Sequence, residues 1–212
     1  MYILAHRGQW KERSEQNTLK AIELAFHNGY GVETDLRDYH GQIVISHDCP
    51  ESDDLPTLDD LLSLYKAYDM SVPLALNVKS DGLQQQCVRA LKKADIQGDG
   101  IFFFDMSIPD ALVYLKNDLP CFTRYSDEEP VPSFLDRACG VWLDGFATDC
   151  TDKDIIFNWL KADLKVCLVS PELHKRNQEK IWSKWRSFLE NMGKSVMICT
   201  DFPQEADRFF NG

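Results

Sequence analysis

The sequence predicts an α/β fold, a compact (β/α)₈ or TIM barrel, and two observations support this class. Short apolar, β-branched or aromatic runs typical of buried strands alternate with helical patterns along all 212 residues, which favours a parallel sheet. Eight such units can be counted if residues 31–47 form one unit with an extra hairpin, and eight units fit a closed barrel better than an open sheet. Neither a Gly-x-Gly-x-x-Gly motif nor a P-loop motif is present to suggest a nucleotide-binding fold.

The predicted strands are the runs in which apolar and β-branched or aromatic residues dominate. In chain order they cover residues 2–6, 31–36, 42–47, 73–79, 100–106, 120–125, 140–146, 165–170 and 195–201. No low-complexity stretch or linker separates these runs. Residues 1–212 are therefore expected to form a single domain.

The first two predicted helices have recognisable start signals. Residues 17–28 have an apolar face at helical spacing, with Asn17 as the expected N-cap and Gly29 as the stop. The pair Thr57 and Asp60 has the spacing of a capping box and predicts a helix start.

The later helices are less uniform. Ser107 followed by Pro109 predicts a helix start, and residues 177–193 are amphipathic and end in glycine. A chain of 212 residues is short for this barrel, so some helices must be short or missing. Residues 128–140 and 203–212 are the candidates.

Charge and hydropathy exclude several function classes. The net charge is -11, with 34 acidic against 23 basic residues and no clustered basic face, so a nucleic-acid partner is not expected. No apolar run approaches the roughly 18 residues of a membrane span, so no membrane partner is expected. The N-terminal residues lack a signal-peptide pattern, and seven scattered cysteines favour reduced, buried thiols. A soluble, cytoplasmic protein is the expectation.

Polar residues recur where the predicted strands end. In barrel enzymes the chemistry lies at the carboxyl ends of the strands, and residues two apart on a strand point the same way. One shared site is therefore expected. Its candidates, in strand order, are His6 and Arg7, Glu33 and Asp35, Asn77 and Lys79, Asp105, Arg124, Asp144, and Asp201.

The carboxylates of Glu33 and Asp35 predict an all-oxygen metal site. No cysteine or histidine stands at comparable spacing, so a hard cation, Mg²⁺ or Ca²⁺, is favoured over zinc. His6 and His47 lie near these carboxylates in the sequence, and imidazoles exchange protons near neutral pH. A metal with acid and base groups is what phosphodiester chemistry requires.

Several motifs resemble those of the glycerophosphodiester phosphodiesterase family, within the phospholipase C-like phosphodiesterases. They are "AHRG", "NTLKAIELAFHNGYGVETDLRDYHGQIVISHD", "LPTLDDLL", "NVK" and "CTDFP". The match is dense over residues 4–79 and rests from residue 80 onward on the order of elements and on the ending. The resemblance implies a TIM barrel with a small insertion after the second strand, a divalent cation and two catalytic histidines.

Six positions match functional positions of that family. They are His6 and His47 for acid–base catalysis, Glu33 and Asp35 for the metal, and Arg7 and Lys79 for the phosphate. Which histidine is the acid and which is the base stays open. The resemblance thus predicts a hydrolase that acts on phosphodiesters.

Two positions depart from the family pattern. Asn77 stands where the family usually has a third acidic metal ligand, and Gln16 stands where it has a glutamate. An amide oxygen can ligate Mg²⁺ or Ca²⁺ without adding charge, so Asn77 is the expected third ligand. Asp105 or Asp144 could instead supply the third carboxylate.

The expected substrate is a glycerophosphodiester or a similar small alcohol or sugar phosphodiester. Trp142 either forms the floor of the substrate pocket or only fills the top of the barrel. Two alternatives remain: a catalytically silent barrel that binds phosphorylated metabolites, and a phospholipase-like enzyme that releases a cyclic phosphate.

Overall fold

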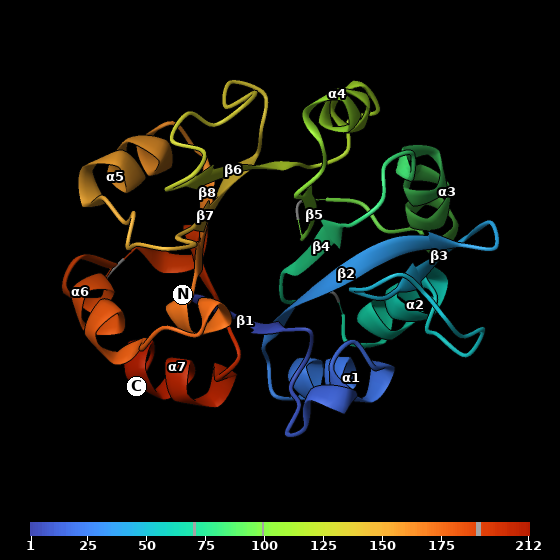
Figure 1. Ribbon diagram of the computed structural model, residues 1–212, viewed down its shortest axis with the longest axis horizontal. Coiled ribbons are helices and arrows are strands. Elements are labelled where there is room, and N and C mark those ends of the chain that lie inside the picture. The colour runs from blue at the N-terminus through green and yellow to red at the C-terminus, as the bar shows by residue number, and fades with distance from the viewer. Residues whose placement is uncertain (70, 99, 190–191) are drawn as a thin grey trace. The chain divides into compact units, whose positions relative to one another are not determined.

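The computed structural model describes residues 1–69, 71–98, 100–189 and 192–212 (Figure 1). The chain divides into two compact units. The N-terminal unit is Ala5–Cys121, and the C-terminal unit combines Met1–Leu4 with Phe122–Gly212. Whether the two units together form a single domain stays a prediction.

In the N-terminal unit the strands follow the order β1-β2-β4-β5, and β3 pairs antiparallel with β2. In Figure 1, α1 lies beside β2, α2 lies beside β3, and α3 packs against α2. The strands are β1 (Tyr2–His6, of which the last two residues belong here), β2 (Gly31–Tyr39), β3 (Gln42–Ile45), β4 (Leu74–Val78) and β5 (Ile101–Phe104). The helices are a 3₁₀ turn (Arg13–Glu15), α1 (Leu19–His27), α2 (Leu58–Ala67), α3 (Gln84–Ala94) and α4 (Ile108–Lys116).

In the C-terminal unit the strand order is β6-β7-β8-β9-β1, with parallel pairing from β6 to β9. Both chain ends lie in this unit, where the Met1 amino group donates a hydrogen bond to Asn211. The strands are β6 (Phe122–Ser126), β7 (Gly140–Asp144), β8 (Lys165–Val169) and β9 (Val196–Thr200). The helices are α5 (Lys153–Lys161), α6 (Glu179–Leu189), α7 (Pro203–Phe210) and two 3₁₀ turns, Pro171–His174 and Gly193–Ser195.

The predicted fold class is confirmed: parallel strands alternate with helices in the order of an α/β TIM barrel. All nine predicted strands are present, and their apolar side chains are almost fully buried. The predicted hairpin after the second barrel strand is the β2–β3 pair. The seven cysteines are unpaired, and Cys87, Cys121, Cys167 and Cys199 are buried as expected; the expectation of burial is wrong for the exposed Cys49 and for the half-buried Cys139 and Cys150.

The helix starts were predicted with one error. Thr57 and Asp60 form the expected capping box. The first long helix, however, is capped by Thr18, whose hydroxyl accepts from the Ala21 amide, and not by Asn17. Asn17 adopts a left-handed backbone (φ 60°), which an N-cap residue does not use, so its side chain is available for another role.

The later helices follow the expectations closely. Ser107 caps α4, residues 128–140 contain no helix, and α7 is a short helix of 8 residues. The predicted amphipathic helix is α6, and residues 190 and 191 near its predicted end lie outside the described residues. In the described part of the chain, no helix combines the length and apolar character that crossing a bilayer requires.

Candidate active site

Strands β2 and β4 bring three oxygen-bearing side chains together. Glu33 and Asp35 lie two residues apart on β2, with 2% and 0% of their surface exposed, and Asp35 is in register with Asn77 on β4. The Asn77 amide nitrogen lies 3.3 Å from Glu33 Oε1 and donates a hydrogen bond to it. The structure thus assembles the three predicted metal ligands from neighbouring strands.

Each of these side chains has a buried oxygen without a hydrogen-bond partner: Glu33 Oε2, Asp35 Oδ1 and Asn77 Oδ1. A buried acceptor without a partner is costly, and a hard cation prefers oxygen ligands. The residues therefore fit Mg²⁺ or Ca²⁺. Among the described residues, no group of three or more His, Cys, Asp or Glu side chains is arranged to hold a metal, so here the third oxygen would come from an amide.

Burial also alters the ionisation of the site. Burial, and next the negative charge of Asp35, raise the pKa of Glu33 to about 7, whereas His6, Arg7 and Lys79 act in the opposite direction. Two carboxylates in one dry site repel each other. Positive charge, from side chains or from a cation, therefore stabilises this pair.

Arg7 and Lys79 supply positive charge beside Asp35. Arg7 Nε lies 3.1 Å from Asp35 Oδ2, and Lys79 Nζ lies 3.6 Å from Asp35 Oδ1. Lys79 Nζ is also 3.6 Å from Asp105 Oδ2, so the lysine stands between two carboxylates. The two side chains predicted to bind phosphate thus lie beside a predicted metal ligand.

The Arg7–Gly8 turn places Arg7 in this position. Both residues have a left-handed backbone, and the Arg7 amide donates to the Glu33 carbonyl. A Cβ on Gly8 would lie 2.7 Å from the Ala21 carbonyl carbon, closer than any side chain tolerates. Glycine is therefore required after Arg7.

His6 lies at the edge of the same cluster. Its Nε2 is 3.8 Å from Glu33 Oε2, and its side chain is 16% exposed, so a ligand could reach it. The Trp10 indole donates to the His6 carbonyl and ties the following loop to the strand end.

His47 follows β3 and is 43% exposed. Its Nδ1 lies 2.9 Å from Asp48 Oδ1, and the Arg37 guanidinium donates to its carbonyl oxygen. Asp48 therefore orients the imidazole. The pairing of His47 with His6 in one reaction stays a prediction.

The C-terminal unit holds the remaining sequence candidates. Trp142 is buried in β7 (5% exposed), and its role as a pocket floor stays a prediction. Asp144 lies 2.6 Å from Nε2 of His174, and Arg124 pairs with Glu129. The Asp144–His174 pair was not predicted, because 30 residues separate its members.

Asn17 is the residue of the N-terminal unit that sequence reasoning assigned to the wrong role. Its amide nitrogen donates to Asp35 Oδ2 at 2.9 Å, and its amide oxygen accepts from the Thr34 hydroxyl at 2.8 Å. Its place directly before Thr18, a good cap, was the one available signal.

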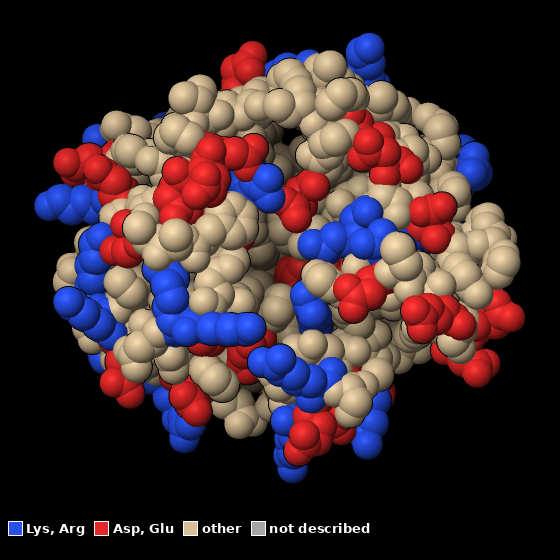
Figure 2. Space-filling model, in the orientation of Figure 1, with Lys and Arg blue, Asp and Glu red and all other residues tan. Residues whose placement is uncertain are grey.

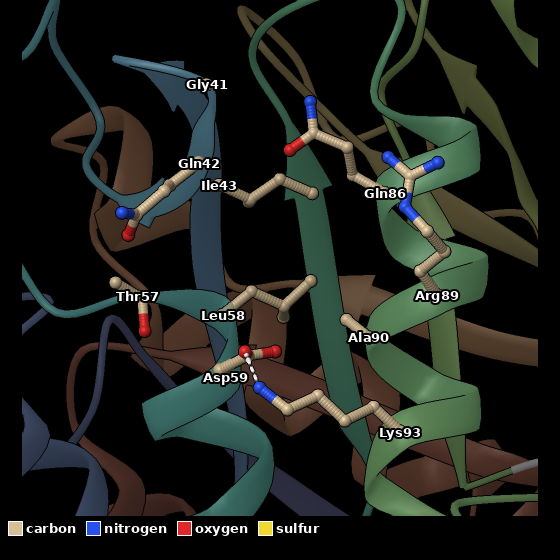
Figure 3. Close-up of a pocket in the computed structure, with 10 residues that line it drawn as sticks. All are labelled: Gly41, Gln42, Ile43, Thr57, Leu58, Asp59, Gln86, Arg89, Ala90 and Lys93. Atoms are coloured by element: carbon tan, nitrogen blue, oxygen red, sulfur yellow. Dashed lines mark hydrogen bonds and ion pairs between the residues drawn. The ribbon is translucent and has the colours of Figure 1, made fainter.

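A separate cavity of about 390 Å³ lies on the same unit between β3, the start of α2 and one face of α3 (Figure 3). The Lys93–Asp59 ion pair closes one end of it. No predicted site residue is among those that line it: Gly41, Gln42, Ile43, Thr57, Leu58, Asp59, Gln86, Arg89, Ala90 and Lys93.

Acidic and basic side chains are mixed over the face of the molecule shown in Figure 2. The absence of a nucleic-acid partner, the substrate class and the cellular compartment stay predictions.

Comparison with known proteins shows the fold. No family model matches the sequence, and no curated protein matches it. A Galdieria sulphuraria protein assigned to the glycerophosphodiester phosphodiesterases has a TM-score of 0.76 and 21% identity, over 100% of this chain and 98% of that one. A glycerophosphodiester phosphodiesterase from Agrobacterium tumefaciens has a TM-score of 0.75 and 16% identity, over 100% and 99%.

A third solved structure, an Oleispira antarctica phosphodiesterase in complex with the product sn-glycerol-3-phosphate, has a TM-score of 0.71 and 19% identity, over 100% of this chain and 97% of that one. These matches span the whole chain at low identity. The family resemblance of the sequence motifs and the structural matches agree, and the fold of this chain is the fold of the glycerophosphodiester phosphodiesterases.

Proposed function

We propose that this protein is a metal-dependent phosphoric diester hydrolase of the glycerophosphodiester phosphodiesterase type. The main support is that Glu33, Asp35 and Asn77 each have a buried oxygen without a hydrogen bond. Beside these oxygens lie two positively charged side chains, Arg7 and Lys79, and the imidazole of His6. The solved phosphodiesterases with the same fold support the reaction class. The substrate is a glycerophosphodiester or a similar small alcohol or sugar phosphodiester.

Arg7 and Lys79 bind the phosphate in this proposal. Both side chains are 20% exposed, so a ligand can reach part of each. The Arg7 guanidinium can donate two parallel hydrogen bonds to phosphate oxygens, and Lys79 contributes a point charge. Asp35 and Asp105 hold the lysine in place until an anion arrives.

His6 and His47 transfer the protons. Hydrolysis breaks one phosphorus–oxygen bond and adds water, so one imidazole accepts the proton of the attacking oxygen and the other protonates the departing alcohol. Glu33 lies 3.8 Å from His6 Nε2, and Asp48 lies 2.9 Å from His47 Nδ1. Asp48 orients the ring of His47, and Glu33 places a carboxylate beside the ring of His6.

Glu33, Asp35 and Asn77 would hold the divalent cation through their unpartnered oxygens. When bound, the cation would polarise the phosphoryl oxygens as a Lewis acid.

The test is hydrolysis of a panel of glycerophosphodiesters with Mg²⁺, with Ca²⁺ and with chelator. We expect turnover only with a cation, and a loss of about 100-fold or more in His6→Ala. His27→Ala is the matched control, because His27 is an exposed residue at the end of α1 and should keep full activity. Phosphorus NMR of the product distinguishes an open monoester from a cyclic phosphate.

Phosphate esters that bind without turnover at any metal would contradict the proposal and favour a silent binding barrel. Equal activity of His6→Ala and wild type would exclude His6 from the reaction.

A further inference from the structure

Asn17 occupies a backbone conformation that ties two parts of the site together. Its φ is 60°, in the left-handed region that asparagine tolerates better than most residues. Its backbone amide donates to the backbone carbonyl of Arg7 at 3.0 Å, and the backbone amide of Arg7 donates to the backbone carbonyl of Glu33 at 2.8 Å. The backbone of Asn17 is thus linked to β2 through Arg7.

The side chain of Asn17 is fixed in one orientation. The Thr34 hydroxyl donates to its Oδ1 at 2.8 Å, and therefore Nδ2 must point to Asp35 Oδ2, 2.9 Å away. Thr34 and Asp35 are both fully buried at 0% exposure, so water cannot replace either contact.

These contacts distinguish the two oxygens of Asp35. Oδ2 accepts from the Asn17 side-chain amide and lies 3.1 Å from Arg7 Nε, whereas Oδ1 has no hydrogen bond and lies 3.6 Å from Lys79 Nζ. A carboxylate held on one side cannot rotate freely, so its other oxygen keeps a constant direction.

We propose that Asn17 is a positioning residue that presents Asp35 Oδ1 to the divalent cation, with Thr34 setting the orientation of the amide. This inference rests on the proposed function. Ligating carboxylates are generally hydrogen-bonded in turn, and loss of such a contact costs about 10- to 100-fold in metal affinity or activity.

Asn17→Gly is the most direct test. Glycine adopts the left-handed backbone without steric strain, and the change removes the side-chain amide while keeping the backbone amide. We expect the apparent affinity for Mg²⁺ or Ca²⁺ alone to fall about 10- to 100-fold, measured by calorimetric titration and by the cation-induced rise in Tm. At saturating cation, kcat should largely recover, because the reacting groups are unchanged.

Two further variants separate positioning from a merely structural role. Thr34→Val keeps the shape of the strand residue and removes the hydroxyl donor, so cation affinity should fall in the same direction but less. Asn17→Asp puts a carboxylate against Asp35, so the metal-free protein should be less stable than that of Asn17→Gly. If Asn17→Gly does not fold, Thr34→Val alone decides the question.

Asp95→Gly is the matched control. Asp95 is an exposed residue with φ 54° at the end of α3. Like Asn17→Gly, this change therefore replaces a polar residue that has a left-handed backbone with glycine. Its cation affinity should equal that of wild type.

The outcomes are distinguishable. Wild type that neither binds a cation nor hydrolyses a phosphodiester overturns both the proposed function and this inference. Wild type that does both, with Asn17→Gly and Thr34→Val binding the cation equally well, overturns the role of Asn17 alone. A fall in Tm that is the same with and without cation would identify these contacts as merely structural.

Discussion

Two glutamates, the buried Glu33 of one unit and the half-buried Glu172 of the other, differ in whether their oxygens have hydrogen-bond partners. Burial raises the pKa of both Glu33 and Glu172. Glu172 accepts from Ser170, Thr200 and the Asp201 amide through its two oxygens, whereas Glu33 has one oxygen without a hydrogen bond. The same residue type thus stabilises the loops after β8 and β9 in one unit, and in the other it keeps a buried oxygen without a hydrogen bond.

Glu33→Gln should show the largest effect. It removes a charged ligand, so turnover should fall by about 100-fold or more. The metal-free protein should become more stable, by about 1 kcal/mol, because a buried charge beside Asp35 is gone. Activity assays and thermal unfolding with chelator test both signs, and a variant that loses stability without cation would contradict this interpretation of the site.

Glu172→Gln makes the same chemical change in the other unit with the opposite expected sign. Ser170 already accepts from the Trp182 indole and Thr200 from the Phe202 amide, so their hydroxyl protons need the carboxylate. One donor would lose its acceptor, at a cost of about 2 kcal/mol. Thermal unfolding should show this loss equally with and without cation; an unchanged Tm would remove the contrast between the two glutamates.

Asn77→Asp sharpens the comparison by adding a third carboxylate to the site. The amide that donates to Glu33 Oε1 would become a charge facing a charge, so the metal-free protein should lose about 2 kcal/mol. Cation affinity should rise, because the charge of the ligands increases. The stability of the variant relative to wild type should therefore fall with chelator and rise with cation. Asn77→Ser, which removes the amide without adding a charge, is the uncharged comparison.

Asp127 gives the smallest expected effect and a test by pH. Burial acts to raise its pKa, but hydrogen bonds from the amides of Ala147, Thr148 and Phe146 outweigh burial and lower the pKa to about 2. A carboxyl whose pKa is lower in the folded state stabilises the protein above its unfolded pKa, about 4. That contribution is lost as the pH falls through about 2.

Asp127→Asn should therefore lower Tm at pH 7, and the difference from wild type should shrink as the pH approaches 2. A difference in Tm that stays constant over this range would show that the carboxylate charge has no part in holding the loop.

Much of the fold was predictable because the strands are short apolar runs with a local signature. The alternation on β2 was enough to place Glu33 and Asp35 on one face, and the same period places Asn77 and Lys79 beside them. These inferences need only the geometry of a strand and the parallel order of the sheet.

The positioning contacts were not predictable from local patterns. Asn17 meets Asp35 across 18 residues, and its left-handed backbone depends on the turn at Arg7. Thr18 and Asn17 are both good caps by residue type, so the choice between them is made by tertiary hydrogen bonds. The Asp144–His174 pair likewise depends on how the end of β7 meets the 3₁₀ turn that follows β8.

The β2–β3 hairpin has a practical use. Its tip is the two-residue turn His40–Gly41, which is exposed, and a Cβ added to Gly41 would meet nothing within 4 Å. The Arg37 guanidinium fastens the His47 carbonyl directly to β2, below this tip. A peptide tag or fluorophore site could therefore be inserted at the tip, only a few residues from His47, without displacing His47.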